Sequence, residues 1–317
     1  MLQLAYTISP YLIRYLERIE AFRQQLLLFP LQPKRELGLQ FIATVERIHF
    51  GLALQEEYVH PEKIKTIIAN QIVFATQKKI PYKDKIQTNT IRYKKVLDYI
   101  KRDWILATEP ITIATIEELF SLSEGSAEIA PRKRIHEVLT YLQASDDNPF
   151  IQAALAKFLF RGLSEETKKT EAFSTMASYL FLYRAGMDCR GLLVLEKLWA
   201  KERKHFEGYY QTSLAKTNLT NWLEYFIKTV SSELEETYQS LQQAANKREE
   251  EKIGNLQERQ KAIMTLVDDP QAIITNRTVQ KIFHISPITA SRDLAKLASL
   301  GLLIQQGKGR SVRYIRI

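Results

Sequence analysis

Apolar side chains recur every three to four positions through most of the first 250 residues, the spacing that lines one face of an α-helix. Strict alternation, which marks half-buried strands, is missing there, so we expect this part of the chain to be almost wholly helical. The clearest stripes are Leu12, Leu16, Ile19 and Leu26; Phe41, Val45, Ile48 and Leu52; Ile64 and Ile68; Tyr93, Leu97, Ile100 and Trp104; and Phe150, Ala154 and Phe158.

Capping residues and prolines divide this region into separate helices. Ser9-Pro10, His60-Pro61 and Asn148-Pro149 each place a proline at a first helical position, and Gly186 ends the apolar run Phe173–Tyr183. Further short helices are expected at Thr115–Leu122 and Pro131–Ala144. Thr220 is expected to cap a long helix whose apolar face carries Leu223, Ile227, Val230, Leu234 and Leu241.

The pattern changes after a charged segment, 247–252, and Gly254. We therefore expect a mainly α-helical protein that ends in a small α+β domain. The predicted divisions are an N-terminal helical region 1–110, a helical core 111–245, a charged linker 246–255 and a C-terminal domain 256–317.

Three short helices are predicted in the C-terminal domain. The first covers Leu256–Val267; the second follows the cap Thr275-Asn276, with Val279, Ile282 and Phe283 turned inward. Ile285-Ser286-Pro287 forms a tight turn, in which Ser286 caps the third helix, Ile288–Ser299. Ala290, Leu294 and Leu297 share one face of that helix and predict its core side.

Two strands are expected to follow, since Leu302–Gln306 and Ser311–Arg316 alternate on either side of the glycine-rich turn Gly307–Arg310. A further short strand is allowed before the third helix. The strings ITASRDLAKLASLGLL and QQGKGRSVRYI closely resemble winged helix-turn-helix domains of bacterial regulators. The resemblance implies that the third helix is a recognition helix and that the turn is a wing.

Charge agrees with a polyanionic partner. The chain has a net charge of +9, and residues 256–317 hold ten Lys or Arg against four Asp or Glu, which leaves +6 in about one-fifth of the sequence. We therefore predict binding to double-stranded DNA, with a homodimer as the expected binding form. The candidate DNA-contacting residues are Ser286, Thr289, Ser291, Arg292, Lys296, Lys308, Arg310 and Arg313.

Composition excludes several other classes. Cys189 is the one cysteine, which rules out an internal disulfide and suits a cytoplasmic protein. The five histidines are scattered, so no metal site is expected. No run of about 18 apolar residues is present, and we expect no membrane partner.

The second half of the helical core carries three motifs in order. These are Leu182–Met187 (LYRAGM), Tyr209–Leu214 (YYQTSL) and Trp222–Phe226 (WLEYF). They are similar to the second half of a Fic (Fido) domain, in which a helix ending LLLYRAG precedes YY-x-x-L and W-x-x-F. The resemblance is specific for about residues 172–240, and it implies a Fic-like helical fold. Tyr209 and Tyr210 would then lie near an adenine, although paired aromatics at helical spacing are usually core residues.

The family's catalytic loop, HPFx(D/E)GNGRxxR, is degenerate here. Its histidine removes a proton from the target hydroxyl, its acid holds magnesium on a triphosphate, and its glycines, Asn and Arg cradle the phosphates. The equivalent stretch, Phe160–Thr170, lacks the histidine and the GNGR core. The polar run inside it consists of Ser164, Glu165, Glu166, Thr167, Lys168 and Lys169. Ser164 is expected to cap the next helix, with Glu165 and Glu166 placing negative charge in its first turn, where it repels phosphate.

Two regulatory parts of the family are also missing. The nine residues between Leu122 and Arg132 are too few for the β-hairpin flap, and Ile48–Leu54 does not match the inhibitory helix. We therefore expect an inactive domain without a cofactor, used for dimerisation or for a partner or ligand. Two alternatives stay open: a divergent nucleotidyl- or AMP-transferase that uses ATP, magnesium and Glu165 or Glu166, and an interaction module that inhibits an active Fic partner.

Overall fold

The computed structural model describes residues 5–74, 84–125, 130–144, 147–164, 170–267, 272–307 and 312–316, without the side chains of 71–74 and 248–252. The chain divides into two compact units, Met1–Gln239 and Ser240–Ile317. None of the helices in these ranges is both long and apolar enough to cross a membrane.

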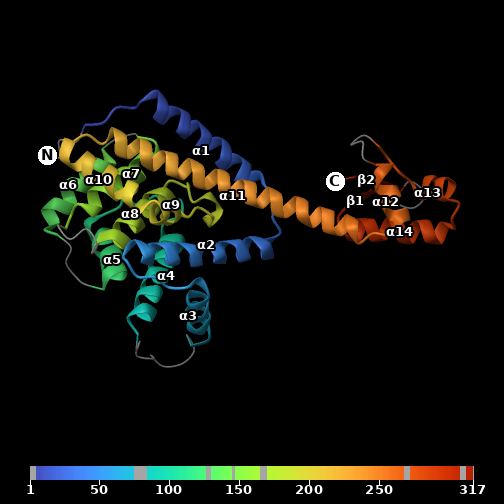
Figure 1. Ribbon diagram of the computed structural model, residues 1–317, viewed down its shortest axis with the longest axis horizontal. Helices are drawn as coiled ribbons and strands as arrows, with labels where there is room; N and C mark the ends of the chain where they lie inside the picture. Colours follow the sequence, from blue (N-terminus) through green and yellow to red (C-terminus); the bar gives the residue numbers. More distant parts are fainter. Residues whose placement is uncertain are drawn as a thin grey trace. The chain divides into compact units, whose positions relative to one another are not determined.

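The N-terminal unit is built from helices (Figure 1), as the periodicity predicts. Within its described residues, the β-structure consists of one isolated bridge, between Ala5 and Asn218. Its helices are α1 (Pro10–Leu28), α2 (Pro33–Leu54), α3 (Pro61–Phe74), α4 (Lys85–Asp103), α5 (Ile113–Glu124), α6 (Arg132–Gln143), α7 (Pro149–Arg161), α8 (Glu171–Arg184), α9 (Leu195–Lys201), α10 (Arg203–Lys216) and the first part of α11 (Thr220–Gly254).

Local capping sets several of these boundaries. The Ser9 hydroxyl accepts the Leu12 N–H at 3.1 Å, and the Asn148 side chain accepts the Phe150 N–H at 2.9 Å, so both predicted caps are confirmed. The cap predicted at Thr220 is wrong. Thr220 is the first residue of α11, and its own N–H is accepted by the Asn218 side chain at 2.9 Å.

Helices α7 and α8 lie at the centre of the unit. Almost every residue of both helices is buried, so each is surrounded by other helices. The Ser178 hydroxyl of α8 donates to the Ala153 carbonyl of α7 at 2.8 Å, and Trp222 of α11 donates to the Ala154 carbonyl at 2.8 Å. Phe41, by contrast, is 37% exposed and does not join the predicted apolar stripe of α2.

Helix α1 runs along α11, as Figure 1 shows. Arg18 of α1 pairs with Glu235 of α11 at 2.7 Å, and Phe22 packs against Tyr238 with ring centroids 6.3 Å apart. Helix α11 continues without a break through the charged segment to Gly254. It is therefore shared by both units.

The C-terminal unit adds α12 (Glu258–Thr265), α13 (Asn276–Phe283), α14 (Pro287–Ser299), β1 (Leu303–Gln306) and β2 (Arg313–Arg316). The two strands are antiparallel, with Leu303 opposite Arg316. Ile274 forms an isolated bridge to Tyr314. This bridge precedes α13, so the short extra strand lies before the second helix of this unit and not before the third.

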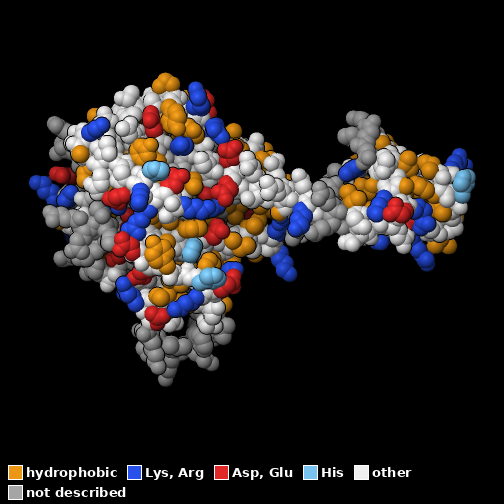
Figure 2. Space-filling model, viewed as in Figure 1, with side chains coloured by type: hydrophobic (Ala, Val, Ile, Leu, Met, Phe, Trp, Pro, Cys, Tyr) orange, Lys and Arg blue, Asp and Glu red, His pale blue; other side chains and the backbone are white. Residues whose placement is uncertain are grey.

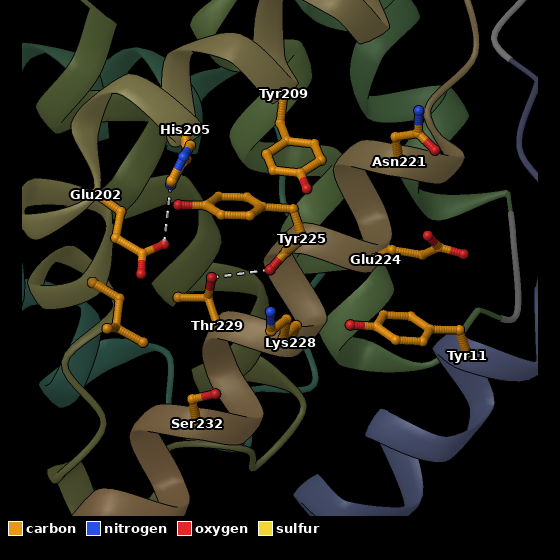
Figure 3. A pocket seen from close by; sticks show the side chains of 11 residues that line it. Tyr11, Glu202, His205, Tyr209, Asn221, Glu224, Tyr225, Lys228, Thr229 and Ser232 are labelled. Atoms are coloured by element: carbon orange, nitrogen blue, oxygen red, sulfur yellow. Dashed lines mark hydrogen bonds and ion pairs between the residues drawn. The ribbon is translucent and has the colours of Figure 1, made fainter.

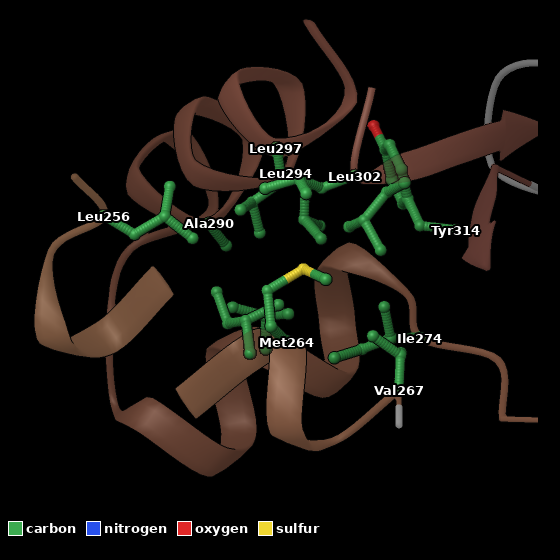
Figure 4. Packing of buried hydrophobic residues seen from close by; sticks show 12 residues of the cluster. Leu256, Met264, Val267, Ile274, Ala290, Leu294, Leu297, Leu302 and Tyr314 are labelled. Carbon is green, nitrogen blue, oxygen red and sulfur yellow. The ribbon is translucent and has the colours of Figure 1, made fainter. Parts of the chain in front are cut away.

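A single apolar core holds these elements together (Figure 4). Ala290, Leu294 and Leu297 of α14 are fully buried in it, as predicted. The inward position predicted for Ile282 is wrong, because its side chain is 47% exposed. Gly301 has φ +67°, and the Leu302 N–H returns to the Leu297 carbonyl at 3.0 Å, which ends α14 in a Schellman-type cap.

Candidate functional site

The outer face of α14 is the first candidate site. Ser286 begins this helix: its hydroxyl accepts the Thr289 N–H at 3.2 Å and lies 2.9 Å from the Thr289 hydroxyl. Both hydroxyls are thus used in capping. The polar face of α14 that periodicity predicts is formed by Ser291, Arg292 and Lys296, which are exposed and take no part in the cap.

The inner face of α14 contains a charged residue that the sequence pattern did not single out. Asp293 is 4% exposed and accepts hydrogen bonds from Arg259 at 2.6 Å and from Gln260 at 2.8 Å. Burial raises the pKa of Asp293, but the Arg259 and Gln260 hydrogen bonds outweigh it and hold the pKa below its usual range. This pairing fixes α14 against α12 and removes one negative charge from the surface.

The remaining candidate residues of this unit lie on or near the strands. Arg313 of β2 donates to the Gln306 side chain of β1 at 3.2 Å, so it is held across the ladder. Lys308 and Arg310 lie outside the described residues. Figure 2 shows Lys and Arg mixed with apolar side chains and a few Asp or Glu on the visible face of this unit.

The second candidate site is the connection between α7 and α8. Ser164 is the last described residue before it, and Glu165, Glu166, Thr167, Lys168 and Lys169 lie outside the described part of the chain. Helix α8 begins at Glu171 after the cap position Thr170, and the capping role predicted for Ser164 concerns residues that lie outside the described part of the chain. The first-turn acid of α8 is therefore Glu171.

The end of α7 and the start of α8 share a buried ion cluster that the sequence analysis did not predict. The Lys157 ammonium donates to Glu171 Oε1 at 2.5 Å and to the Thr175 hydroxyl at 2.7 Å, and Arg161 Nε donates to Glu171 Oε2 at 2.7 Å. Arg161 also pairs with the half-exposed Glu207 at 2.6 Å. Burial lowers the pKa of Lys157, whereas the two cations hold the pKa of Glu171 low against its burial.

A further carboxylate approaches the same helix end. Burial raises the pKa of Glu124, at the end of α5, to about 7, and a hydrogen bond from the Phe173 backbone opposes the rise. The first turn of α8 is therefore occupied by the chain's own carboxyl groups. A triphosphate needs free N–H groups and positive charge at such a helix end.

A cleft of about 430 Å³ opens between α6, α7 and α10, and Gly162 and Leu163 at the end of α7 border it. Phe158, Tyr210 and Leu214 contribute its apolar lining, and Lys133 and Arg134 its cations. Arg134 donates to the Gly162 carbonyl at 2.9 Å. Tyr210 is buried, as expected of a core aromatic, but Tyr209 is 41% exposed and points to a different cavity.

The other histidine and carboxylate candidates do not assemble into a metal site. Among the described residues, no three His, Cys, Asp or Glu side chains come close enough to hold a metal ion. Cys189 is buried, and His205 is exposed beside Glu202. Glu196 is fully buried and accepts from the Tyr93 and Tyr179 hydroxyls, each at 2.7 Å, in a network that ties α4, α8 and α9 together.

Comparison with known proteins identifies the fold. No protein-family model matches the chain, and no curated protein is similar to it in sequence. A solved structure does match: a Fic family protein from Desulfovibrio desulfuricans G20, with a TM-score of 0.59 and 12% identity, over 99% of this chain and 98% of that chain. The protein thus has a Fic-like fold.

Proposed function

We propose that this protein binds double-stranded DNA through a winged helix-turn-helix domain formed by its C-terminal unit, and that it acts as a transcriptional regulator. The observation that carries the proposal is the division of α14 into two faces. Ala290, Leu294 and Leu297 are buried, whereas Ser291, Arg292 and Lys296 are exposed on a helix that follows α13 after a short turn. A recognition helix needs this division, because its outer face must reach base edges in the major groove.

Charge supports DNA over a neutral partner. Residues 256–317 hold a formal surplus of +6, and one of their four acids, Asp293, is buried against Arg259. We assign Arg292 and Ser291 to base edges and Lys296 to phosphate. Thr289 and Ser286 position the start of the helix. Lys308, Arg310 and Arg313 are assigned to phosphates as part of the wing.

The Fic-like unit is proposed to be catalytically inactive. Phe160–Thr170 contains no histidine to act as the general base and no GNGR to cradle phosphates. Glu171 is paired with the two buried cations Lys157 and Arg161, so neither cation is free to bind a phosphate. We propose that this unit serves in homodimerisation or holds a partner or ligand, and that the protein works in the cytoplasm without a cofactor.

A second candidate is a protein-interaction module, such as an inhibitor of an active Fic partner. Apolar side chains exposed on the C-terminal unit favour it. Ile288 is 66% exposed at the start of α14, and Leu266, Ile273, Ile282 and Ile304 are each at least 41% exposed. Ile288 at the start of a recognition helix can also contact a thymine methyl group, so this residue suits both candidates.

Selection of genomic fragments by the full-length protein at physiological salt separates the candidates. The DNA-binding proposal expects enrichment of a defined sequence, which is lost when Ser291, Arg292 and Lys296 are all changed to alanine. The control removes two cations from the N-terminal unit, Lys65→Ala with Arg102→Ala, and should keep the enrichment. Recovery of no fragment above background, or equal recovery by the triple variant, would favour the interaction module.

A further inference from the structure

A second cavity is lined by other residues of α10 than the cleft that contains Tyr210 and Leu214. Its volume is about 430 Å³, and it is formed by α1, α10, α11 and the end of α9 (Figure 3). All of its lining residues belong to the N-terminal unit. Cavities of this size are large enough for a small organic ligand.

Aromatic rings dominate one wall of the cavity. Tyr209 and Tyr225 stack with ring centroids 4.6 Å apart and an angle of 17° between their planes. Tyr209 remains 41% exposed, so a further flat group can pack against this stack. Tyr225 is 7% exposed, and its buried hydroxyl has no hydrogen-bond partner among the described residues. A buried hydroxyl without a hydrogen-bond partner lowers the stability of the folded state.

The charge of the lining is net negative. Glu202 and Glu224 border the cavity from two sides, and Lys228 is the one lysine or arginine among the residues that line it within the described ranges. The carboxylates act on the tyrosines across this space. The pKa of Tyr11 rises to about 12 through its hydrogen bond with Tyr15, its burial and the nearby charge of Glu224. An anion placed among these groups would be repelled.

We infer that this cavity is a binding site for a small aromatic cation, such as an arylalkylamine. The flat ring of the ligand would extend the Tyr209–Tyr225 stack, and its ammonium group would lie near Glu224. A cation is also attracted by the negative faces of tyrosine rings, so the aromatic and acidic parts of the wall select the same ligand.

A ligand in this cavity would contact the long helix α11. Helix α11 supplies Asn221, Glu224, Tyr225, Lys228, Thr229 and Ser232. The same helix continues past residue 240, where the C-terminal unit begins. A ligand here would therefore contact a helix that both units share. The binding site itself does not rest on the proposed DNA-binding function.

Calorimetry with tryptamine and the full-length protein tests the inference, with 3-indolepropionate as an anionic probe that carries the same ring. We expect tryptamine to bind and 3-indolepropionate not to bind. Tyr209→Ala and Glu224→Gln should each weaken tryptamine binding about tenfold. Lys228→Gln removes an exposed opposing charge and should tighten it by about fivefold. This last variant changes a solvent-facing side chain and should fold normally.

Two matched controls lie away from the cavity, at exposed positions: Tyr58→Ala and Glu62→Gln. Both should bind tryptamine like the wild type. The inference is overturned if tryptamine does not bind at millimolar concentration, if 3-indolepropionate binds as well as tryptamine, or if Lys228→Gln leaves the affinity unchanged or weakens it.

Discussion

The buried carboxylate of Glu171 should be one of the most sensitive positions in the N-terminal unit. It is 3% exposed and forms ion pairs with two buried cations, Lys157 and Arg161. Glu171→Gln keeps the shape of the side chain but removes its charge. Lys157 and Arg161 then remain in the interior without their shared counter-ion.

The expected cost follows from this geometry. Breaking a buried ion pair by removing one partner costs about 3–5 kcal/mol, because the remaining charge is left without solvent or partner. Folded proteins are stable by roughly 5–15 kcal/mol in total. For a unit of this size, each 1 kcal/mol shifts the melting temperature by about 2–4 °C, so we expect a fall of roughly 6–20 °C. Amide hydrogen exchange should become faster in helix α8 before it does so in the other helices.

The pH dependence gives a second signature. Burial already lowers the pKa of Lys157, and loss of Glu171 removes the group that opposes this shift. In the variant, the unfolded chain therefore binds more protons than the folded one between the lowered pKa of Lys157 and about 10.4, the value of a free lysine. The stability of the variant should consequently rise with pH in this window. The difference in free energy of unfolding between the wild type and the variant should therefore be smaller at pH 9.5 than at pH 7.

Urea unfolding followed by tryptophan fluorescence measures this change in the right unit, because Trp104, Trp199 and Trp222 all lie in it. Glu207→Gln is the matched control, since Glu207 pairs with the same Arg161 but its side chain is 40% exposed. That change should cost less than about 1 kcal/mol. If Glu171→Gln were no more destabilising than Glu207→Gln, the buried ion cluster would not have the role given to it here.

Two further predictions concern the same unit. Incubation with labelled ATP, magnesium or manganese and cell lysate should leave no labelled protein; label that disappears in Glu165→Ala or Glu166→Ala would show that the unit is an active transferase. Burial raises the pKa of Glu233 in α11 to about 7. The folded state therefore keeps a proton that the unfolded chain releases above about pH 4.3, and the free energy of unfolding should fall as the pH rises toward 7. Glu233→Gln should therefore unfold at higher urea than the wild type at pH 8 and at a similar urea concentration at pH 5; an unchanged midpoint at pH 8 would contradict the assigned pKa.

Local signals in the sequence predicted the helices well. Ser9, Asn148, Thr275 and Ser286 each cap a helix as expected, because capping depends on a few neighbouring atoms. Periodicity also separated the buried and exposed faces of α14. It failed at Ile282, where α13 is only eight residues long and a short helix defines its buried face poorly.

Contacts between helices could not be read from the sequence in the same way. Lys157 and Glu171 are 14 residues apart on different helices, and the apolar pattern around Lys157 gives no sign of a charged partner. The same holds for Asp293 and Arg259, which meet only after α12 and α14 pack together. Tyr209 and Tyr225 belong to recognisable motifs, but only the fold brings them together with Glu202 and Glu224 in one cavity.

The wing and the recognition helix should contribute to DNA binding in different ways. Lys308→Ala with Arg310→Ala should weaken binding to all duplexes about equally and lower the salt slope by roughly two, because both residues are assigned to phosphates. Arg292→Ala should cost about 1–3 kcal/mol on the preferred sequence and much less on random duplex, because it is assigned to a base edge.

Fluorescence anisotropy with a selected duplex and a scrambled duplex, measured across a salt series, therefore tests the central claim most directly. The account predicts that the wild type and the control Arg102→Ala prefer the selected duplex, and that Arg292→Ala loses most of this preference while still binding DNA. The claim that this face of the C-terminal unit binds DNA would be contradicted if both Arg292→Ala and the wing variant bound the two duplexes like the wild type.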